Sequence, residues 1–248
     1  MKRPWIALPT VVLLSTMLVA QAQPVLGAQQ PQQPQQPQQA QQPQQPEFIR
    51  QGNQLARDGK LQEAYDLFQK HLSDPKEGFA AHIASGNVLD LMGKGEQARK
   101  HFAEAVAMAP TPQQKAQANR ATAMSYAFEG NCAKAVEFEN KVIEFQKAEK
   151  DFFAQGEVSN EAARVCLDAG DIDTAYKLYK QGYDLGMQEP NIKPERVDLW
   201  NFRWEHAQAR IAARRGNKGE AEKHVAAAKA ILDKGTNPQQ AQFFPYLV

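Results

Sequence analysis

The amino-acid sequence lacks the motifs that identify most enzymes and metalloproteins. It contains no His-Glu-x-x-His zinc motif, no Gly-x-Ser-x-Gly nucleophile elbow and no phosphate-binding loop. Its five histidines form no pair at helical spacing, and its many carboxylates are typical of solvated helix surfaces. We therefore expect a protein that is not an enzyme, with no catalytic residues, no metal site and no cofactor.

A strong excess of charge of either sign is also missing. The chain carries 29 Lys and Arg against 28 Asp and Glu, and without residues 1–22 the basic total falls to 27 because Lys2 and Arg3 are removed. A net charge of −1 argues against general nucleic-acid binding, which needs a dense cationic surface. Beyond the N-terminus no apolar run is long enough for a membrane span.

The N-terminus reads as a secretory signal peptide over residues 1–22. Two basic residues precede a mostly apolar run from Ile6 to Ala20, which ends in the small-x-small sequence Ala20-Gln21-Ala22. The alternative is a retained membrane anchor, but the 15-residue run is short for a span of about 20 residues and Pro9 interrupts it. No cysteine follows for lipid attachment. We expect export to the periplasm or the extracellular space.

Residues 23–46 are predicted to be a disordered linker. From residue 29 the chain repeats Gln-Gln-Pro triplets, which offer nothing to bury and favour the polyproline II conformation. The favoured interpretation is a semi-rigid spacer. The alternative is a segment that docks on a cell-wall or proline-recognising surface.

The rest of the chain contains an internal repeat. Five residues recur 34 positions later: Gly52, Leu55, Gly59, Ala64 and Phe68 become Gly86, Leu89, Gly93, Ala98 and Phe102. The spacing from a small residue through glycine to alanine occurs three more times, with its alanines at Ala135, Ala175 and Ala221. Each glycine is placed where a helix must end, and the small residues allow two antiparallel helices to approach closely.

These residues resemble the signature of the tetratricopeptide repeat family over about residues 47–233. The second unit matches best, with Gly86, Leu89, Ala98, Phe102 and Pro110 at the family's spacing, while Glu139 and Val225 replace the expected aromatic in units three and five. The resemblance implies an all-α fold, a right-handed superhelical solenoid of about five helical hairpins over residues 47–248.

The resemblance also places the only two cysteines. Cys132 would begin the second helix of unit three, and Cys166 would lie near the end of the first helix of unit four. Because those helices pack antiparallel in such a stack, the two thiols should face each other. In an exported protein we expect a disulfide, the alternative being two buried, reduced cysteines.

In the family, the first helix of each hairpin lines a concave groove that binds protein or peptide partners. The corresponding candidate residues here are Asn53, Asn87, Arg120, Met124, Arg164 and Arg210. Asparagine amides can bond to an extended peptide backbone, and arginines can pair with carboxylates. The alternative is that these polar residues only keep the groove soluble. Of the family's lysine–asparagine set for terminal carboxylates only Asn53 is kept, so binding of that kind is not expected.

The predicted function is therefore an exported adaptor or scaffold that binds a protein or peptide. One alternative is an assembly factor whose repeats associate into a homo-oligomer, and another, without support in the sequence, is a hydrolase accessory protein or degenerate enzyme. The apolar segment Phe243–Val248 should cap the last hairpin, or else dock a partner.

Overall fold

The computed structural model describes residues 45–247, which form ten α-helices and one 3-10 helix and contain no strand. The helices are α1 (Glu47–Arg57), α2 (Leu61–Gln69), α3 (Gly78–Leu91), α4 (Gly95–Met108), α5 (Pro112–Phe128), α6 (Cys132–Ala148), α7 (Phe152–Asp168), α8 (Ile172–Gly186), α9 (Pro194–Arg214), α10 (Lys218–Leu232) and the 3-10 helix η1 (Pro238–Leu247). The predicted signal peptide and nearly all of the predicted linker lie outside the described residues. Among the described helices, none is both long and apolar enough to traverse a membrane.

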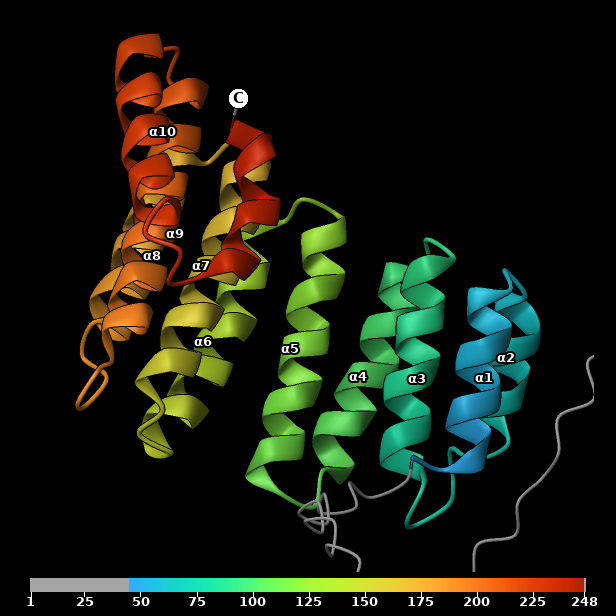
Figure 1. Ribbon diagram of the computed structural model, residues 1–248. Helices are drawn as coiled ribbons and strands as arrows, with labels where there is room; N and C mark the ends of the chain where they lie inside the picture. The colour runs from blue at the N-terminus through green and yellow to red at the C-terminus, as the bar shows by residue number, and fades with distance from the viewer. Residues whose placement is uncertain (1–44, 248) are drawn as a thin grey trace, which may run out of the picture. The chain divides into compact units, whose positions relative to one another are not determined.

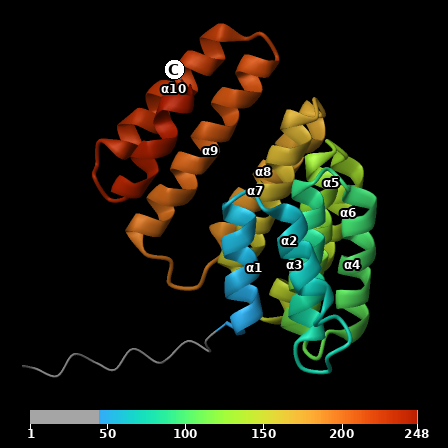
Figure 2. The ribbon, with the colours of Figure 1, turned by 90° about the vertical axis from the view of Figure 1, so that its right-hand side faces the viewer.

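The ten α-helices pair into five hairpins that stand side by side (Figure 1). The second helix of each hairpin packs on the first helix of the next, and the first helices also touch, α1 against α3 and α3 against α5. The last hairpin is inclined relative to the first ones (Figure 2). An all-α solenoid of five helical hairpins is the predicted fold class, which the structure confirms.

The glycine in each signature ends the first helix of its hairpin. Gly59 has a φ of +77°, and the N–H of Lys60 donates to the carbonyl of Leu55 at 2.9 Å, which closes the last turn. The equivalent glycines, Gly93, Gly130, Gly170 and Gly216, also have positive φ. A β-carbon at Gly59 would meet no atom within 4 Å, so backbone conformation and not crowding selects glycine at this position.

The core follows the repeat. The signature alanines of the first four hairpins are at most 1% exposed, and the Phe68 and Phe102 rings are completely buried. Ala221 of the last hairpin is only half-buried, because no sixth hairpin covers α10. Glu139 takes the place of an aromatic in the third hairpin, and it is 1% exposed.

The two cysteines meet where the third and fourth hairpins join. Cys132 is the first residue of α6, Cys166 lies in the last turns of α7, and their Cα atoms are 4.7 Å apart. The structure joins their sulfur atoms. The predicted proximity is thus present, and the oxidation state in the cell stays a prediction.

Candidate functional site

Three hollows follow one another along the side formed by the first helices. One lies between α3 and α5, the second between α5 and α7 with residues of α6 in its lining, and the third between α7 and α9. Gln117 and Arg120 line both the first and the second hollow, while Glu157 lines both the second and the third. The three hollows therefore adjoin one another, and together we call them the groove.

The α3–α5 hollow presents large apolar side chains to solvent. Leu91 is 62% exposed and Phe128 is 70% exposed, and Ile83 and Met124 line the same hollow. Leu91 and Phe128 are the last residues of α3 and α5, two positions before the helix-ending glycine. Clustered, exposed apolar side chains on a folded domain mark a binding surface, because covering them with a partner lowers the free energy.

Polar groups interrupt this apolar surface. Asn87 and Asp90 line the α3–α5 hollow, and Ser125 Oγ donates to Asp90 Oδ1 at 2.8 Å. Burial raises the pKa of Asp90 although that hydrogen bond opposes the shift. Asn87 is exposed and forms no side-chain hydrogen bond within the described part of the chain, so its amide is available to a ligand backbone.

An ion pair crosses the groove between α5 and α7. Arg120 donates to Glu161 Oε2 from Nε at 2.9 Å and from Nη2 at 2.6 Å. Glu139 is buried close to both, and its Oε2 atom lacks a hydrogen-bond partner. Burial first, and then the charge of Glu161, raise the pKa of Glu139 to about 8, so its carboxyl is protonated at neutral pH.

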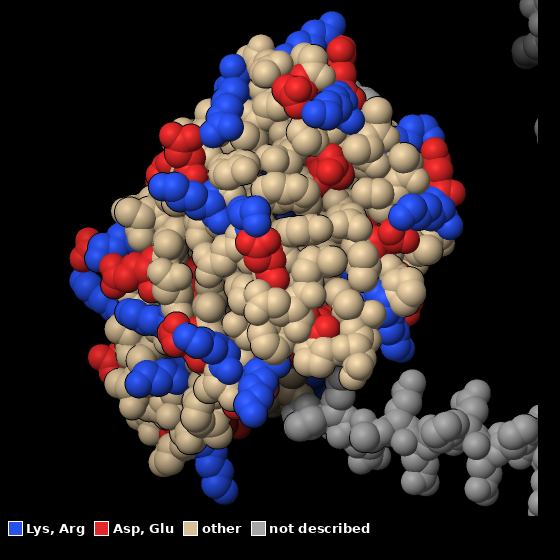
Figure 3. Space-filling model, turned by 90° about the vertical axis from the view of Figure 1, so that its left-hand side faces the viewer, with Lys and Arg blue, Asp and Glu red and all other residues tan. Residues whose placement is uncertain are grey.

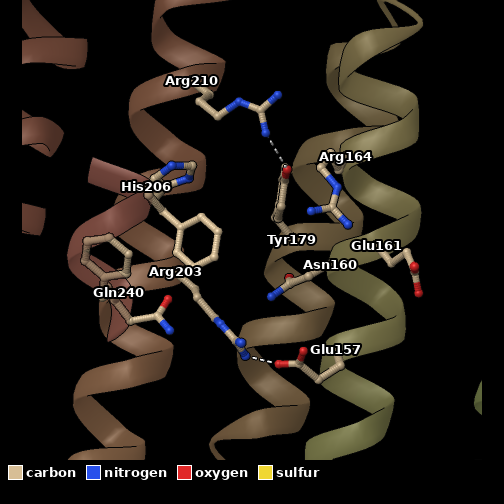
Figure 4. A pocket seen from close by; sticks show the side chains of 11 residues that line it. Glu157, Asn160, Glu161, Arg164, Tyr179, Arg203, His206, Arg210 and Gln240 are labelled. Carbon is tan, nitrogen blue, oxygen red and sulfur yellow. Dashed lines mark hydrogen bonds and ion pairs between the residues drawn. The ribbon is translucent and has the colours of Figure 1, made fainter. Parts of the chain in front are cut away.

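Charged side chains dominate the α7–α9 hollow (Figure 4). Arg203 pairs with Glu157, and burial lowers the pKa of Arg203 to about 10. Arg210 donates to the Tyr179 hydroxyl at 3.4 Å and to Asp168 at 3.0 Å. Arg164, on the α7 side of the hollow, is exposed and forms neither a hydrogen bond nor an ion pair with any residue that the structure describes.

The C-terminal segment closes one side of the α7–α9 hollow. Gln240 and Phe243 of η1 line it together with residues of α7, α8 and α9. His206 of α9 also lines this hollow; its Nε2 atom is buried and has no hydrogen-bond partner among the described residues, and burial lowers the pKa of His206 to about 4. The segment contacts α9 and α10, but it lies toward the groove instead of over the outer side of α10 (Figure 1).

The structure brings together most of the candidate residues. Asn87, Arg120 and Met124 line the α3–α5 hollow, and Arg164 and Arg210 line the α7–α9 hollow. Asn53 is half-buried on α1 and belongs to none of the three hollows. Tyr179, Gln240 and Phe243 were not among the predicted groove residues; they reach the site from the second helix α8 and from the returning C-terminal segment.

Histidines from different helices meet in the second hairpin, which spacing along one helix could not reveal. His82 Nδ1 and His101 Nδ1 are 3.1 Å apart, and His101 Nε2 lies 3.4 Å from the Tyr65 hydroxyl. Burial lowers the pKa of both histidines. In residues 45–247, no group of three or more His, Cys, Asp or Glu side chains is arranged to hold a metal ion.

Charge on the surface is mixed. On the side of the molecule shown in Figure 3, Lys and Arg alternate with Asp and Glu among uncharged residues. That side therefore offers no continuous cationic patch of the kind that tracks a nucleic-acid backbone.

No protein-family model matches this sequence, and no curated protein matches it. Solved structures do match. A kinesin light chain-like protein of Podosopora anserina with nearly identical TPR-like repeats has a TM-score of 0.59 and 18% identity, over 76% of this chain and 94% of that one. BtubC (BKLC) from P. vanneervenii has a TM-score of 0.57 and 14% identity, over 75% and 79%. A structure of MamA has a TM-score of 0.52 and 15% identity, over 75% and 96%. The described part of this chain has the tetratricopeptide repeat fold, which confirms the resemblance seen in the sequence.

Proposed function

We propose that this protein is a non-catalytic scaffold that binds a peptide or an extended segment of a partner protein in the groove. The observation that carries the proposal is the succession of three adjoining hollows along the first helices, with exposed apolar side chains at one end. A groove formed by stacked repeats is a common protein-binding surface.

The α3–α5 hollow is the expected anchor point. Leu91 and Phe128 expose large apolar surfaces to water. A ligand side chain that covers both removes this surface from solvent, which favours binding. Beside them, the Asn87 amide can donate to and accept from a ligand backbone. The expected ligand feature at this position is an aromatic or branched aliphatic residue in an extended segment.

The α7–α9 hollow adds a charge preference. Glu157 and Asp168 already engage the arginines of α9, whereas Arg164 has no partner among the described residues. A ligand carboxylate that reaches Arg164 gains a charge-assisted hydrogen bond without breaking an existing pair. A ligand with an acidic residue C-terminal or N-terminal to its apolar anchor therefore fits the groove.

Export completes the proposal. The signal-like residues 1–22, the Gln/Pro-rich residues 23–46 and the pair of cysteines support a tethered adaptor in the periplasm or outside the cell. A fusion of residues 1–30 to a reporter that is active only after export tests the location. An inactive reporter would contradict it.

The binding proposal is tested by selecting peptides on the full chain from a displayed random library and measuring their affinity by fluorescence anisotropy. Phe128→Glu should weaken binding at least tenfold, about 1.4 kcal/mol, because it puts a charge where an apolar side chain docks. Lys100→Glu is the matched control, since Lys100 is a 72%-exposed residue of the second helix α4. Equal loss in both variants, or no loss in Phe128→Glu, would contradict the proposal.

A further inference from the structure

The C-terminal segment is aimed at the groove by a small set of polar contacts. Asp198 of α9 accepts hydrogen bonds from Lys234 Nζ at 2.6 Å and from Thr236 Oγ1 at 3.0 Å. Asn237 Nδ2 then donates to the Glu195 carbonyl at 2.6 Å. These contacts fix the chain just before η1, so that η1 returns along α9 toward α7.

Beyond these contacts the segment is held lightly. Most of the η1 residues whose side chains are described are exposed, and Phe243 is 44% exposed. Among the described side chains of η1, none forms a hydrogen bond with another described residue; Gln240 and Phe243 instead line the hollow beside His206 of α9. Few contacts and high exposure are the properties of a segment that opens at low cost in free energy.

The segment nevertheless occupies ligand space. Gln240 and Phe243 line the α7–α9 hollow beside Asn160 and Arg164 of α7, which face it in Figure 4. No side chain from Gly235 to Val248 is charged, and Arg164 has no partner among the described residues. It fills part of the hollow with the aromatic ring of Phe243 and the uncharged amide of Gln240, and neither group pairs with Arg164.

We propose that the α7–α9 hollow is a docking site for a short aromatic peptide segment, and that the chain's own Pro238–Leu247 is its resident, displaceable occupant. The proposal rests on the proposed function in taking the groove as the ligand-binding face. A tethered segment is present at an effective concentration of about 1 mM. An outside ligand must displace it, so the segment lowers the apparent affinity of the α7–α9 hollow for any competitor.

The test uses a fluorescent synthetic peptide of residues 238–248, the full chain, and a chain truncated after Asn237. The truncated chain keeps all ten α-helices and the contacts to Asp198 and Glu195. If the free peptide binds with a Kd of about 0.1 mM, the tethered copy should weaken its binding to the full chain about tenfold relative to the truncated chain. A peptide with Phe243→Ala should bind the truncated chain several-fold more weakly, and one with Gln239→Ala should bind normally.

Three outcomes would overturn the proposal: no binding to the truncated chain, equal binding to both chains, or equal binding of a scrambled peptide. If the truncated chain does not fold by circular dichroism, the full chain with Phe243→Ala and Phe244→Ala replaces it and should bind the peptide more tightly than the unchanged chain. Failure here is distinct from failure of the proposed function, which is measured at Phe128 in the α3–α5 hollow.

Discussion

The Phe68 ring of α2 lies so close to Gly52 of α1 that a β-carbon on that glycine would come within 2.1 Å of the ring. The same relationship recurs in the second hairpin, where a β-carbon at Gly86 would be 2.3 Å from Phe102. The glycine and the aromatic ring are thus two halves of one packing unit, which explains why the sequence repeats them together.

Gly86→Ala is therefore expected to destabilise the fold by about 1–3 kcal/mol, because the buried Phe102 ring must move. In a helix interior that is not crowded, the same change usually stabilises by about 0.5–1 kcal/mol. Gly219→Ala in α10 is the control, since its β-carbon would meet nothing closer than 4.0 Å. Urea unfolding gives the change in the free energy of unfolding for each variant. Equal changes in the two variants would contradict the packing argument.

The raised pKa of Glu139 predicts that stability decreases as pH rises toward 8. Its pKa is about 8 in the folded protein and near its ordinary value of 4.5 when unfolded, so between these values the folded state holds a proton that the unfolded state lacks. The free energy of unfolding should therefore fall as pH rises from 4.5 to 8. Glu139→Gln, which resembles the protonated form, should gain about 1–3 kcal/mol over the unchanged chain between pH 5 and pH 8. If the difference in the free energy of unfolding between the two proteins stays constant from pH 5 to pH 8, Glu139 does not titrate in this way.

The His82–His101 pair predicts the opposite dependence at acidic pH. One imidazole must donate its Nδ1–H to the other across 3.1 Å, so the two cannot both be protonated without repulsion. With both pKa values lowered by burial, the unfolded state binds more protons, and stability is lost as pH falls below about 6.5. His82→Phe should remove part of that loss at pH 5. Thermal unfolding at pH 5 and pH 8 measures it, and unchanged acid sensitivity would contradict the pairing.

The cysteine pair makes a prediction about redox state. In protein isolated from the exporting host, alkylation under denaturing, non-reducing conditions should modify neither Cys132 nor Cys166. The double Cys→Ala variant should lose about 3–4 kcal/mol of stability in the chain-entropy model for a loop of this length. Two alkylated cysteines in the native protein would overturn the disulfide.

Much of the fold could be predicted from the sequence because the repeat is a local pattern. Gly59 and Gly93 mark helix ends by their backbone conformation, and Thr111 followed by Pro112 is a local pattern typical of a helix start; α5 begins there, and Thr111 Oγ1 accepts from the Gln114 N–H at 3.2 Å. The pairing of Cys132 with Cys166 followed from the stacking of neighbouring hairpins once the family was recognised.

The parts that escaped prediction depend on contacts between distant segments. The returning path of η1 is set by the contact of Lys234 with Asp198, which lies 36 residues earlier in the chain, and no local sequence pattern predicts that contact. The burial of Glu139 next to Glu161 likewise depends on how α6 and α7 pack. Leu91 and Phe128 were recognisable as residues of the first helices, but only the structure shows how exposed they are.

The most direct test of the groove as the binding surface is site-specific photo-crosslinking to a selected peptide ligand. A photoreactive residue is placed at position 124, in the α3–α5 hollow, and separately at position 100 on the outer helix α4. We expect a crosslink from position 124 that excess unlabelled peptide abolishes, and none from position 100. A specific crosslink from position 100 without one from position 124 would place the ligand on the other side of the solenoid and contradict the account.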